Sequence, residues 1–334
     1  MLLRPILLLL PALALASFQD PAVAPDPAVV VGDGAHRYRW DGAWPRLPES
    51  VVLGNTHGNV AVDARGRIYF NTDSEHAFVV VEPDGTFVRS FGKEWAGGLH
   101  GMALVREGEQ EFLYIAHLGR HCSAKLTLEG EVLWTVGWPE ASGLYASEGE
   151  FNPTAIAVRP DGGFYVADGY GKGWVHEYGP DRAWRRAFGG RGSEPGRFQT
   201  PHGLLLDTAG AEPLLVVADR ENHRLQRFNL RGELVDVIQA ELRRPCSLAR
   251  RGDLYAVADL TGRVTLIDAV QGKLAAHLAE QPDPAKRAQN GVPRTDWRPG
   301  ELLSPHGVAF GLDGAIYVED WNHLGRVSRM APLK

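Results

Sequence analysis

The sequence is poor in cysteine, because only Cys122 and Cys246 occur among its 334 residues. Two cysteines in a chain this long exclude a fold held together by a framework of disulfides. The sequence also lacks an excess of basic residues, since 35 Lys and Arg stand against 41 Asp and Glu, giving a net charge of −6. That balance argues against the broad positive surface by which proteins bind nucleic acid. We therefore expect no nucleic-acid partner.

Long hydrophobic runs are missing as well. No segment is apolar over the roughly 20 residues that a membrane-spanning helix needs, so we expect no membrane span. The apolar run at residues 6–15 follows Arg4, is broken by Pro11 and ends before Ala16. This pattern is typical of a secretory signal peptide over residues 1–16, with an uncleaved anchor as the alternative. It predicts a secreted or periplasmic protein, and the Pro-, Ala- and Asp-rich residues 17–36 predict a disordered leader.

What the chain does contain is a repeated unit, which recurs from about residue 52 to the C-terminus at the ~50-residue spacing of propeller blades. The clearest copy starts at Thr200 and reads TPHGLLLD, then LLVVADRENHRLQRF, then LVDVIQ. Its short apolar runs are bounded by Gly, Pro, Asp or Asn, as antiparallel strands are. Six such copies predict an all-β fold, a six-bladed β-propeller of four-stranded NHL-like blades, as a single domain over residues 37–334.

The sixth copy supplies only three strands before the chain ends at Lys334. An open ring would leave unpaired strand edges. We therefore expect residues 37–44, RYRWDGAW, to supply the missing outer strand of blade six and to close the propeller.

Histidines occupy four of the six positions where a repeat enters its first strand, the strand that lines the channel of a propeller. In register, the six entry positions hold His57, His100, Thr154, His202, Cys246 and His306. His100, His202 and His306 come from alternate blades, so their imidazoles should approach one point on the axis from three directions. Three neutral imidazoles with an open fourth position suit Zn²⁺. The alternative is that histidine merely donates to a backbone carbonyl at this turn, and His57 lies outside the alternating set.

Two loops between the second and third strands of their blades should lie on the same face as the entry histidines. They carry Tyr170 in ADGYGKG and Arg220 in ADRENHR. A cation nearby favours the phenolate form of tyrosine, and arginine can bind a carboxylate through two parallel hydrogen bonds. The alternatives are an ordinary half-buried tyrosine and an ion pair of Arg220 with Asp219 or Asp168. A Pro-rich insertion at residues 278–303 is expected over this face as a lid, or as simple padding.

These residues resemble a known family, the lyase domain of the peptidylglycine α-amidating enzymes. The similarity is densest over residues 151–228, through YVADGYG, FGGRGSEPGRFQTPHGLLL and VADRENHRLQRF, and it returns at SPHGVAFGLDGAIYVED. The resemblance implies a zinc-dependent lyase that cleaves a carbinolamide to an amide and glyoxylate. It implies His100, His202 and His306 as zinc ligands, with Tyr170 and Arg220 as catalytic residues.

The chain departs from that family in four places. No arginine aligns with the family's active-site arginine in blade one, and Gly307 stands where the family has a calcium-binding carboxylate. Gly171 and Arg227 replace two cysteines of a disulfide. The zinc site is thus carried over by the resemblance, whereas Ca²⁺ and the disulfide are not.

Two functions of different classes remain open from the sequence. The first is the zinc-dependent lyase, acting on a small-molecule or peptide substrate. The second is a non-enzymatic exported propeller that binds a peptide or protein partner across the histidine face. A calcium-dependent propeller hydrolase is disfavoured, because it needs acidic and amide side chains where this chain has histidines.

Overall fold

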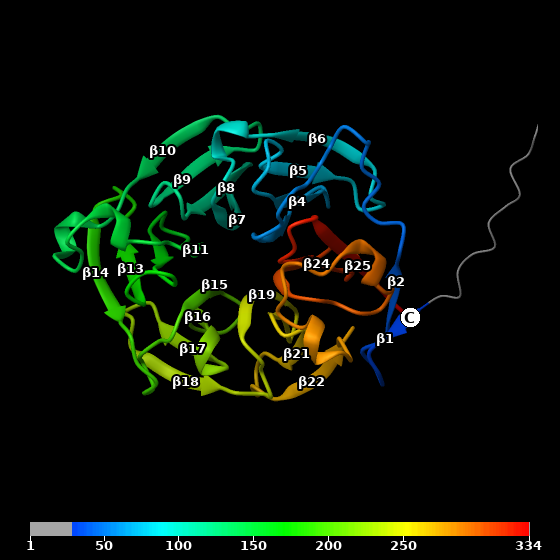
Figure 1. Cartoon of the computed structure of the whole chain (residues 1–334). Helices are drawn as coiled ribbons and strands as arrows, with labels where there is room; N and C mark the ends of the chain where they lie inside the picture. The colour runs from blue at the N-terminus through cyan, green and yellow to red at the C-terminus, as the bar shows by residue number, and fades with distance from the viewer. Residues whose placement is uncertain (1–28, 334) are drawn as a thin grey trace, which may run out of the picture.

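Each repeat folds as a small antiparallel sheet because its apolar runs are strand-length and the turns between them are rich in Gly and Asp. The computed structural model describes residues 29–333, and these form six sheets arranged as blades around a central channel (Figure 1). Within five blades the strands pair in chain order, whereas in blade six two N-terminal strands lie outside the three C-terminal ones. The prediction of an all-β, six-bladed β-propeller is confirmed.

The strands of the first three blades are as follows. Blade one contains β3 (Val60–Val62), β4 (Ile68–Asn71), β5 (Phe78–Val81) and β6 (Phe87–Phe91). Blade two contains β7 (Leu99–Glu107), β8 (Gln110–His117), β9 (Cys122–Thr127) and β10 (Val132–Val136). Blade three contains β11 (Ala155–Val158), β12 (Phe164–Ala167), β13 (Trp174–Tyr178) and β14 (Trp184–Gly189).

The other three blades follow the same plan. Blade four contains β15 (Pro201–Asp207), β16 (Leu214–Asp219), β17 (Arg224–Asn229) and β18 (Leu234–Ile238). Blade five contains β19 (Pro245–Arg251), β20 (Leu254–Asp259), β21 (Arg263–Asp268) and β22 (Leu274–Leu278). Blade six contains β23 (Pro305–Phe310), β24 (Ile316–Asp320) and β25 (Arg326–Pro332), with β2 (Tyr38–Asp41) and β1 (Val30–Val31) outside them.

Helix is confined, among the described residues, to single 3₁₀ turns in the connections. These turns are η1 (Lys93–Trp95), η2 (Glu140–Ser142), η3 (Glu148–Glu150), η4 (Arg220–Asn222), η5 (Pro284–Lys286) and η6 (Arg294–Asp296). Over residues 29–333 the chain has no helix of the length and hydropathy needed to cross a bilayer.

The hydrophobic core lies between neighbouring blades. Alternate side chains of a strand point to opposite faces, and both faces of each blade are covered by the next blade on either side. In blade one, Phe70 packs toward Tyr317 of blade six, whereas Phe78 packs toward Ile115 of blade two. The two cysteines are free and lie in different blades, Cys122 in β9 and Cys246 in β19. Packing therefore holds the ring together without a disulfide.

The ring is closed by the segment that the sequence predicts. β2 pairs antiparallel with β25, from Tyr38 opposite Pro332 to Asp41 opposite Arg329. Figure 1 shows β2 beside β25 at the outer edge of blade six. The interpretation of residues 17–36 as a disordered leader is wrong for its last part, because Val30–Val31 form β1 and pair with β2. Val31 is buried in the core between blades five and six. The predicted signal peptide at 1–16 lies outside the described residues.

Deleting residues 37–44 is expected to lower the melting temperature more than deleting residues 17–36. The first deletion removes the whole of β2 and the buried Trp44, whereas the second removes only the two-residue strand β1 among the described residues. Thermal unfolding of both truncations against the full chain measures the difference. Equal melting temperatures would contradict closure of the ring by β2.

Candidate metal centre

Three histidines point into the channel because each occupies a β-bulge at the start of its blade. In blade two, Leu99 lies opposite His117 but Gly101 lies opposite Ala116, so His100 is the extra residue. The same shift occurs around His202 and around His306. A bulge re-aims the side chain of its extra residue and is often found next to functional sites. The bulges thus turn three side chains from alternate blades toward the axis.

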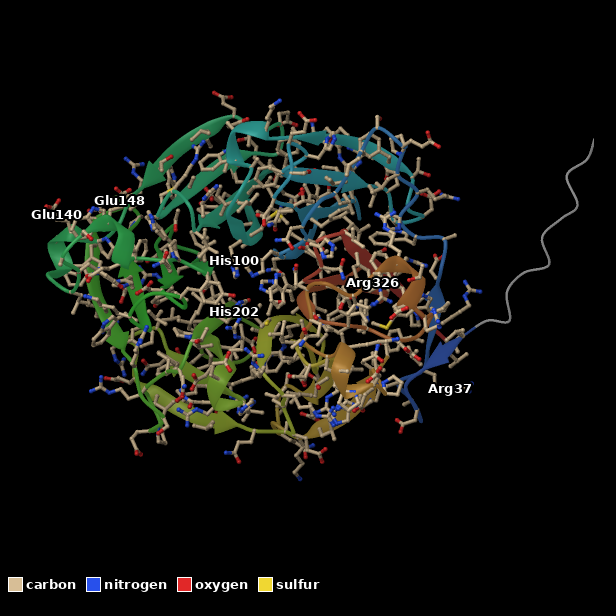
Figure 2. The ribbon with its side chains drawn as sticks, in the orientation of Figure 1. Arg37, His100, Glu140, Glu148, His202 and Arg326 are labelled. Atoms are coloured by element: carbon tan, nitrogen blue, oxygen red, sulfur yellow. The ribbon has the colours of Figure 1, made fainter. Side chains whose placement is uncertain are left out.

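The three imidazoles meet as a nearly regular triangle. Ring centroids of His100 lie 4.8 Å from those of both His202 and His306, and the centroids of His202 and His306 lie 4.6 Å apart. Figure 2 shows His100 and His202 side by side at the centre of the ring. All three side chains are buried. The structure therefore brings the rings of the three predicted ligands together, although among the described residues no group of candidate ligand atoms within 4.8 Å of one another contains all three.

A backbone carbonyl of the following blade fixes the tautomer of each histidine. Nδ1 lies 2.8 Å from the Thr154 carbonyl for His100, 2.9 Å from the Cys246 carbonyl for His202 and 2.8 Å from the Gly58 carbonyl for His306. Because a carbonyl oxygen only accepts, each Nδ1 carries the proton and each Nε2 keeps its lone pair. The alternative reading, that histidine at this turn donates to a carbonyl, thus describes Nδ1 and leaves Nε2 available for a ligand bond.

The glycine after each histidine lets that carbonyl come close. A Cβ on Gly101 would lie 2.6 Å from the Thr154 oxygen, and a Cβ on Gly203 would lie 2.3 Å from the Cys246 oxygen. Real side chains do not tolerate such approaches. The His-Gly pair therefore aims the imidazole and admits the acceptor that orients it.

The free imidazole nitrogens match the donors that Zn²⁺ prefers. Nε2 of His100 and of His306 is buried without a hydrogen-bond partner within the described part of the chain. Nε2 of His202 is bonded only to the Tyr170 hydroxyl, at 2.9 Å. Burial lowers the pKa of all three histidines well below 6.5, so the imidazoles are neutral at ordinary pH. Neutral, tautomer-fixed imidazoles with unused lone pairs fit a zinc ion.

Two further side chains join the cluster. Candidate ligand atoms of His57, His100 and His306 lie within 4.8 Å of one another, and so do those of His202, Cys246 and His306. The sequence places His57 outside the ligand set, yet its ring lies 4.8 Å from that of His100 and 4.7 Å from that of His306. Burial lowers the pKa of His57 to about 4.

Cys246 was not predicted as a candidate ligand from the sequence. It occupies the entry position of blade five, follows a proline as His202 and His306 do, and sits on a bulge of the same kind. This equivalence of position could have identified it.

Tyr170 and Arg220 lie against the histidine cluster, as predicted. The Tyr170 hydroxyl donates to His202 Nε2 and accepts from Arg220 Nη1 at 3.0 Å. Burial raises the pKa of Tyr170, and the positive charge of Arg220 opposes that rise. The expected alternative ion pair of Arg220 with Asp219 or Asp168 is wrong, because Arg220 Nε binds Glu221 at 2.9 Å.

The two aspartates have other partners, which explains that error. Asp219 accepts from Arg224 at 2.8 Å, and Asp168 accepts from the Tyr145 hydroxyl at 2.7 Å. Both carboxylates thus hold their own loops together and leave the Arg220 guanidinium to Tyr170 and Glu221.

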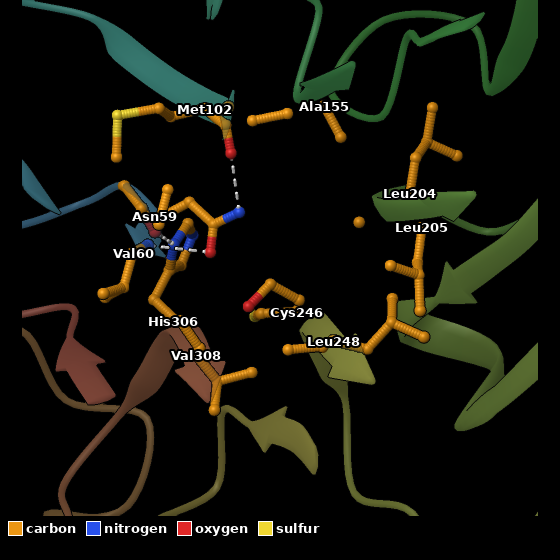
Figure 3. Close-up of a pocket in the computed structure, with 18 of the residues that line it drawn as sticks. Asn59, Val60, Met102, Ala155, Leu204, Leu205, Cys246, Leu248, His306 and Val308 are labelled. Carbon is orange, nitrogen blue, oxygen red and sulfur yellow. Dashed lines mark hydrogen bonds between the residues drawn. The ribbon is translucent and has the colours of Figure 1, made fainter. Parts of the chain in front are cut away.

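The calcium ion of the resembling family does not fit this chain. A Cβ on Gly307 would lie 2.7 Å from the Asn59 Cα, so the backbone of blade one fills the space that a carboxylate at this position would need. The side-chain Nδ2 of Asn59 instead donates to the Met102 carbonyl at 3.1 Å. This bond links blades one and two beside His306 (Figure 3).

The channel continues past the histidines as a cavity of about 340 Å³ lined by the first strands of all six blades. Its labelled walls in Figure 3 include Val60, Leu204, Leu248 and Val308. The insertion at 278–303 lies on the other side of the histidines from this cavity, at the face where the first strands begin; there Asn290 donates to Asn55 at 2.8 Å. The insertion therefore lies on the histidine face, as expected, over blades six and one.

Comparison with known proteins gives relatives of two kinds. No protein-family model matches the chain. Peptidyl-glycine alpha-amidating monooxygenase B of Xenopus laevis is 30% identical over 281 residues, which cover 78% of this chain and 29% of that protein. The mouse enzyme is 25% identical over 346 residues, which cover 91% of this chain and 33% of that protein.

The second kind of relative is NHL repeat-containing protein 3. The human protein is 29% identical over 202 residues, covering 58% of this chain and 56% of that protein. The matched regions thus span 29% and 56% of the frog enzyme and of the human protein.

Solved structures support the fold alone. A gluconolactonase from Xanthomonas campestris superposes with a TM-score of 0.60 at 18% identity, covering 93% of this chain and 99% of that chain. A streptogramin B lyase superposes with a TM-score of 0.58 at 12% identity, covering 88% and 97%.

Proposed function

Because this six-bladed β-propeller is homologous to the peptidyl-glycine alpha-amidating monooxygenases and to NHL repeat-containing protein 3, we propose that it is a zinc-dependent lyase. Its substrate is a carbinolamide, which it cleaves to an amide and glyoxylate. The observation that carries the proposal is the set of three buried Nε2 lone pairs beside the Tyr170–Arg220 pair.

His100, His202 and His306 would hold the zinc ion through Nε2. When bound, zinc supplies a Lewis acid that polarises the substrate α-hydroxyl oxygen and makes its proton more acidic. The chain contributes the neutral imidazoles and their fixed orientation. His306 and His100 need no change of hydrogen bonding to bind zinc, whereas His202 gives up its bond from Tyr170.

Tyr170 is the residue placed to move the substrate proton. Its hydroxyl is 3.0 Å from the Arg220 guanidinium, and although burial raises the pKa of Tyr170, the charge of Arg220 opposes that rise and a bound cation would oppose it further. As phenolate, Tyr170 removes the proton of the α-hydroxyl; the C=O bond of glyoxylate forms as the C–N bond breaks, and the proton returns to the departing amide nitrogen. Atoms and charge balance without an oxidant or reductant.

Arg220 is the residue placed to bind the substrate carboxylate. Among its recorded hydrogen bonds, Nε and Nη1 are used by Glu221 and Tyr170, which leaves Nη2 for a carboxylate oxygen. The loop of blade one that carries an arginine in the resembling family carries Asp73 here, whose carboxylate accepts from Asn55 and from the Gly98 amide. Arg220 is therefore the basic residue that we assign to the carboxylate.

The proposal is tested by product analysis on a peptide that ends in α-hydroxyglycine. Zinc-loaded protein is expected to release glyoxylate and peptide amide in equal amounts, and protein stripped with a chelator is expected to recover that rate when zinc is returned. Absence of glyoxylate above the uncatalysed rate with zinc-loaded protein would refute the lyase.

A second candidate is an exported propeller that binds a peptide or protein partner on the histidine face without turnover. This candidate is kept because the chain is also similar, over 58% of its length, to NHL repeat-containing protein 3, whose name states no enzymatic activity. Zinc binding without glyoxylate formation, together with calorimetric binding of the unreacted peptide, would support this candidate over the lyase. In both cases we propose export, with one propeller domain that starts at β1 rather than at residue 37.

A further inference from the structure

One position in the second strand of each blade shows an unexpected pattern. In four blades the residue paired with the first-strand residue directly after the entry position is alanine. These are Ala116, Ala167, Ala218 and Ala258. At the equivalent position, blade one has Asn71 and blade six has Glu319, opposite Gly307. Both polar side chains are completely buried, and they belong to neighbouring blades. Burying a polar group costs free energy unless it is hydrogen-bonded, so both need a structural reason.

The reason lies in the entry of blade one. Its first strand, β3, begins only at Val60, so Gly58 and Asn59 lie outside the ladder. Two side chains replace the missing backbone partners: Glu319 Oε1 accepts from the Gly58 amide at 2.7 Å, and Asn71 Oδ1 accepts from the Asn59 amide at 2.9 Å. A Cβ on Gly58 would lie 1.8 Å from Asn71 Nδ2, so only glycine admits this arrangement.

The same backbone segment orients a predicted metal ligand. The Gly58 carbonyl, which accepts from His306 Nδ1 at 2.8 Å, belongs to the peptide group whose N–H binds Asn71. Asn71 Nδ2 also donates to the carbonyl of Leu99 at 2.8 Å, directly before His100. Asn71 is therefore bonded to the backbone beside two of the three histidines, and Figure 3 shows Asn59 next to His306.

We propose that Asn71 and Glu319 are positioning residues for the metal centre. They fix the Gly58–Asn59 backbone so that its carbonyl holds His306, and Asn71 also fixes the approach to His100. The proposal rests on the proposed function for the identity of the ion, but the hydrogen bonds that carry it involve no ion. Outer partners of metal ligands typically contribute 10–100-fold to metal affinity.

The test compares zinc affinity with thermal stability in five variants. Asn71→Ala and Glu319→Ala are expected to weaken zinc binding by at most the roughly 10–100-fold typical of groups bonded directly to a metal ligand, because they act on His306 through the Gly58–Asn59 backbone. Glu319→Gln keeps the acceptor for Gly58 and should restore affinity, and Asn71→Asp keeps one of two bonds and should fall between. Tyr255→Phe is the control, because it removes a buried hydrogen bond to Asp207 far from any ligand histidine. It should lower the melting temperature and leave zinc affinity unchanged.

A second measurement needs no metal and keeps the proposal separate from the lyase. In metal-free protein, proton exchange at imidazole Nδ1 is followed by NMR. Asn71→Ala should speed exchange at His306 and leave His202 unchanged, because the Cys246 acceptor of His202 lies in blade five and makes no recorded bond to Asn71. Unchanged exchange at His306 together with wild-type zinc affinity would overturn the positioning role, whereas failure of wild-type protein to bind zinc would overturn only the proposed function.

Discussion

His202→Ala is expected to lose most of its bound zinc while keeping the propeller fold. Two imidazoles are too few for a tight catalytic zinc site, which ordinarily has three protein ligands. The fold should survive because blade packing, rather than the ion, closes the ring. Zinc should raise the melting temperature of wild type but not of the variant, since a ligand stabilises only the state that binds it. Metal content and melting temperature, measured on protein prepared with zinc and without chelator, give both results.

Alanine variants of the other histidines test which of them bind zinc. His100→Ala and His306→Ala should lose zinc as His202→Ala does. His57→Ala should retain close to one equivalent of zinc, because His57 belongs to blade one and the predicted ligands come from blades two, four and six. Its ring nevertheless lies against those of His100 and His306. His121→Ala is a remote control, since His121 binds the Phe151 carbonyl instead. Loss of zinc from His57→Ala as complete as from His202→Ala would contradict the ligand set.

Tyr170→Phe is expected to lower turnover at least tenfold, which corresponds to about 1.4 kcal/mol in the activation barrier. The phenylalanine keeps the ring that packs against His100 and His202 but cannot accept a proton. Zinc content should stay near wild type and the fold should be kept, while the melting temperature should fall because the bonds of the hydroxyl to His202 and Arg220 are lost. Glyoxylate release from an α-hydroxyglycyl peptide measures the effect.

Tyr145→Phe is the matched control for this substitution. Tyr145 lies against the same loop, where its hydroxyl bonds Asp168 and His176 rather than a channel histidine. It should lose stability but keep the turnover of its folded fraction. Unchanged kinetics in Tyr170→Phe would remove Tyr170 from the mechanism.

Most of the fold could be predicted from the sequence because each blade repeats one pattern. Six entry turns, each followed by several strand-length apolar runs, give the blade number, and the missing strand of the sixth copy gives closure by residues 37–44. The strand at Val30–Val31 could not be separated from the leader, because two residues of pairing leave too short a pattern among Pro and Ala.

The candidate site was predictable where it depends on register and not where it depends on individual contacts. The alternating positions of His100, His202 and His306 place them on one axis. The pairing of Arg220 with Glu221 and the contact of His57 with its neighbours depend on loop geometry that no periodicity encodes. In the sequence Asn71 and Glu319 only replace the alanine found in four other blades. Their role can be seen only once it is known that the first strand of blade one is short.

The most direct test of the metal centre is anomalous diffraction at the zinc absorption edge from crystals of the full chain grown with zinc. We expect one peak per chain on the propeller axis, about 2.0–2.1 Å from Nε2 of His100, His202 and His306. A crystal without a stoichiometric peak at the axis, or a peak bonded to His57 in place of His202, would contradict the three-histidine site.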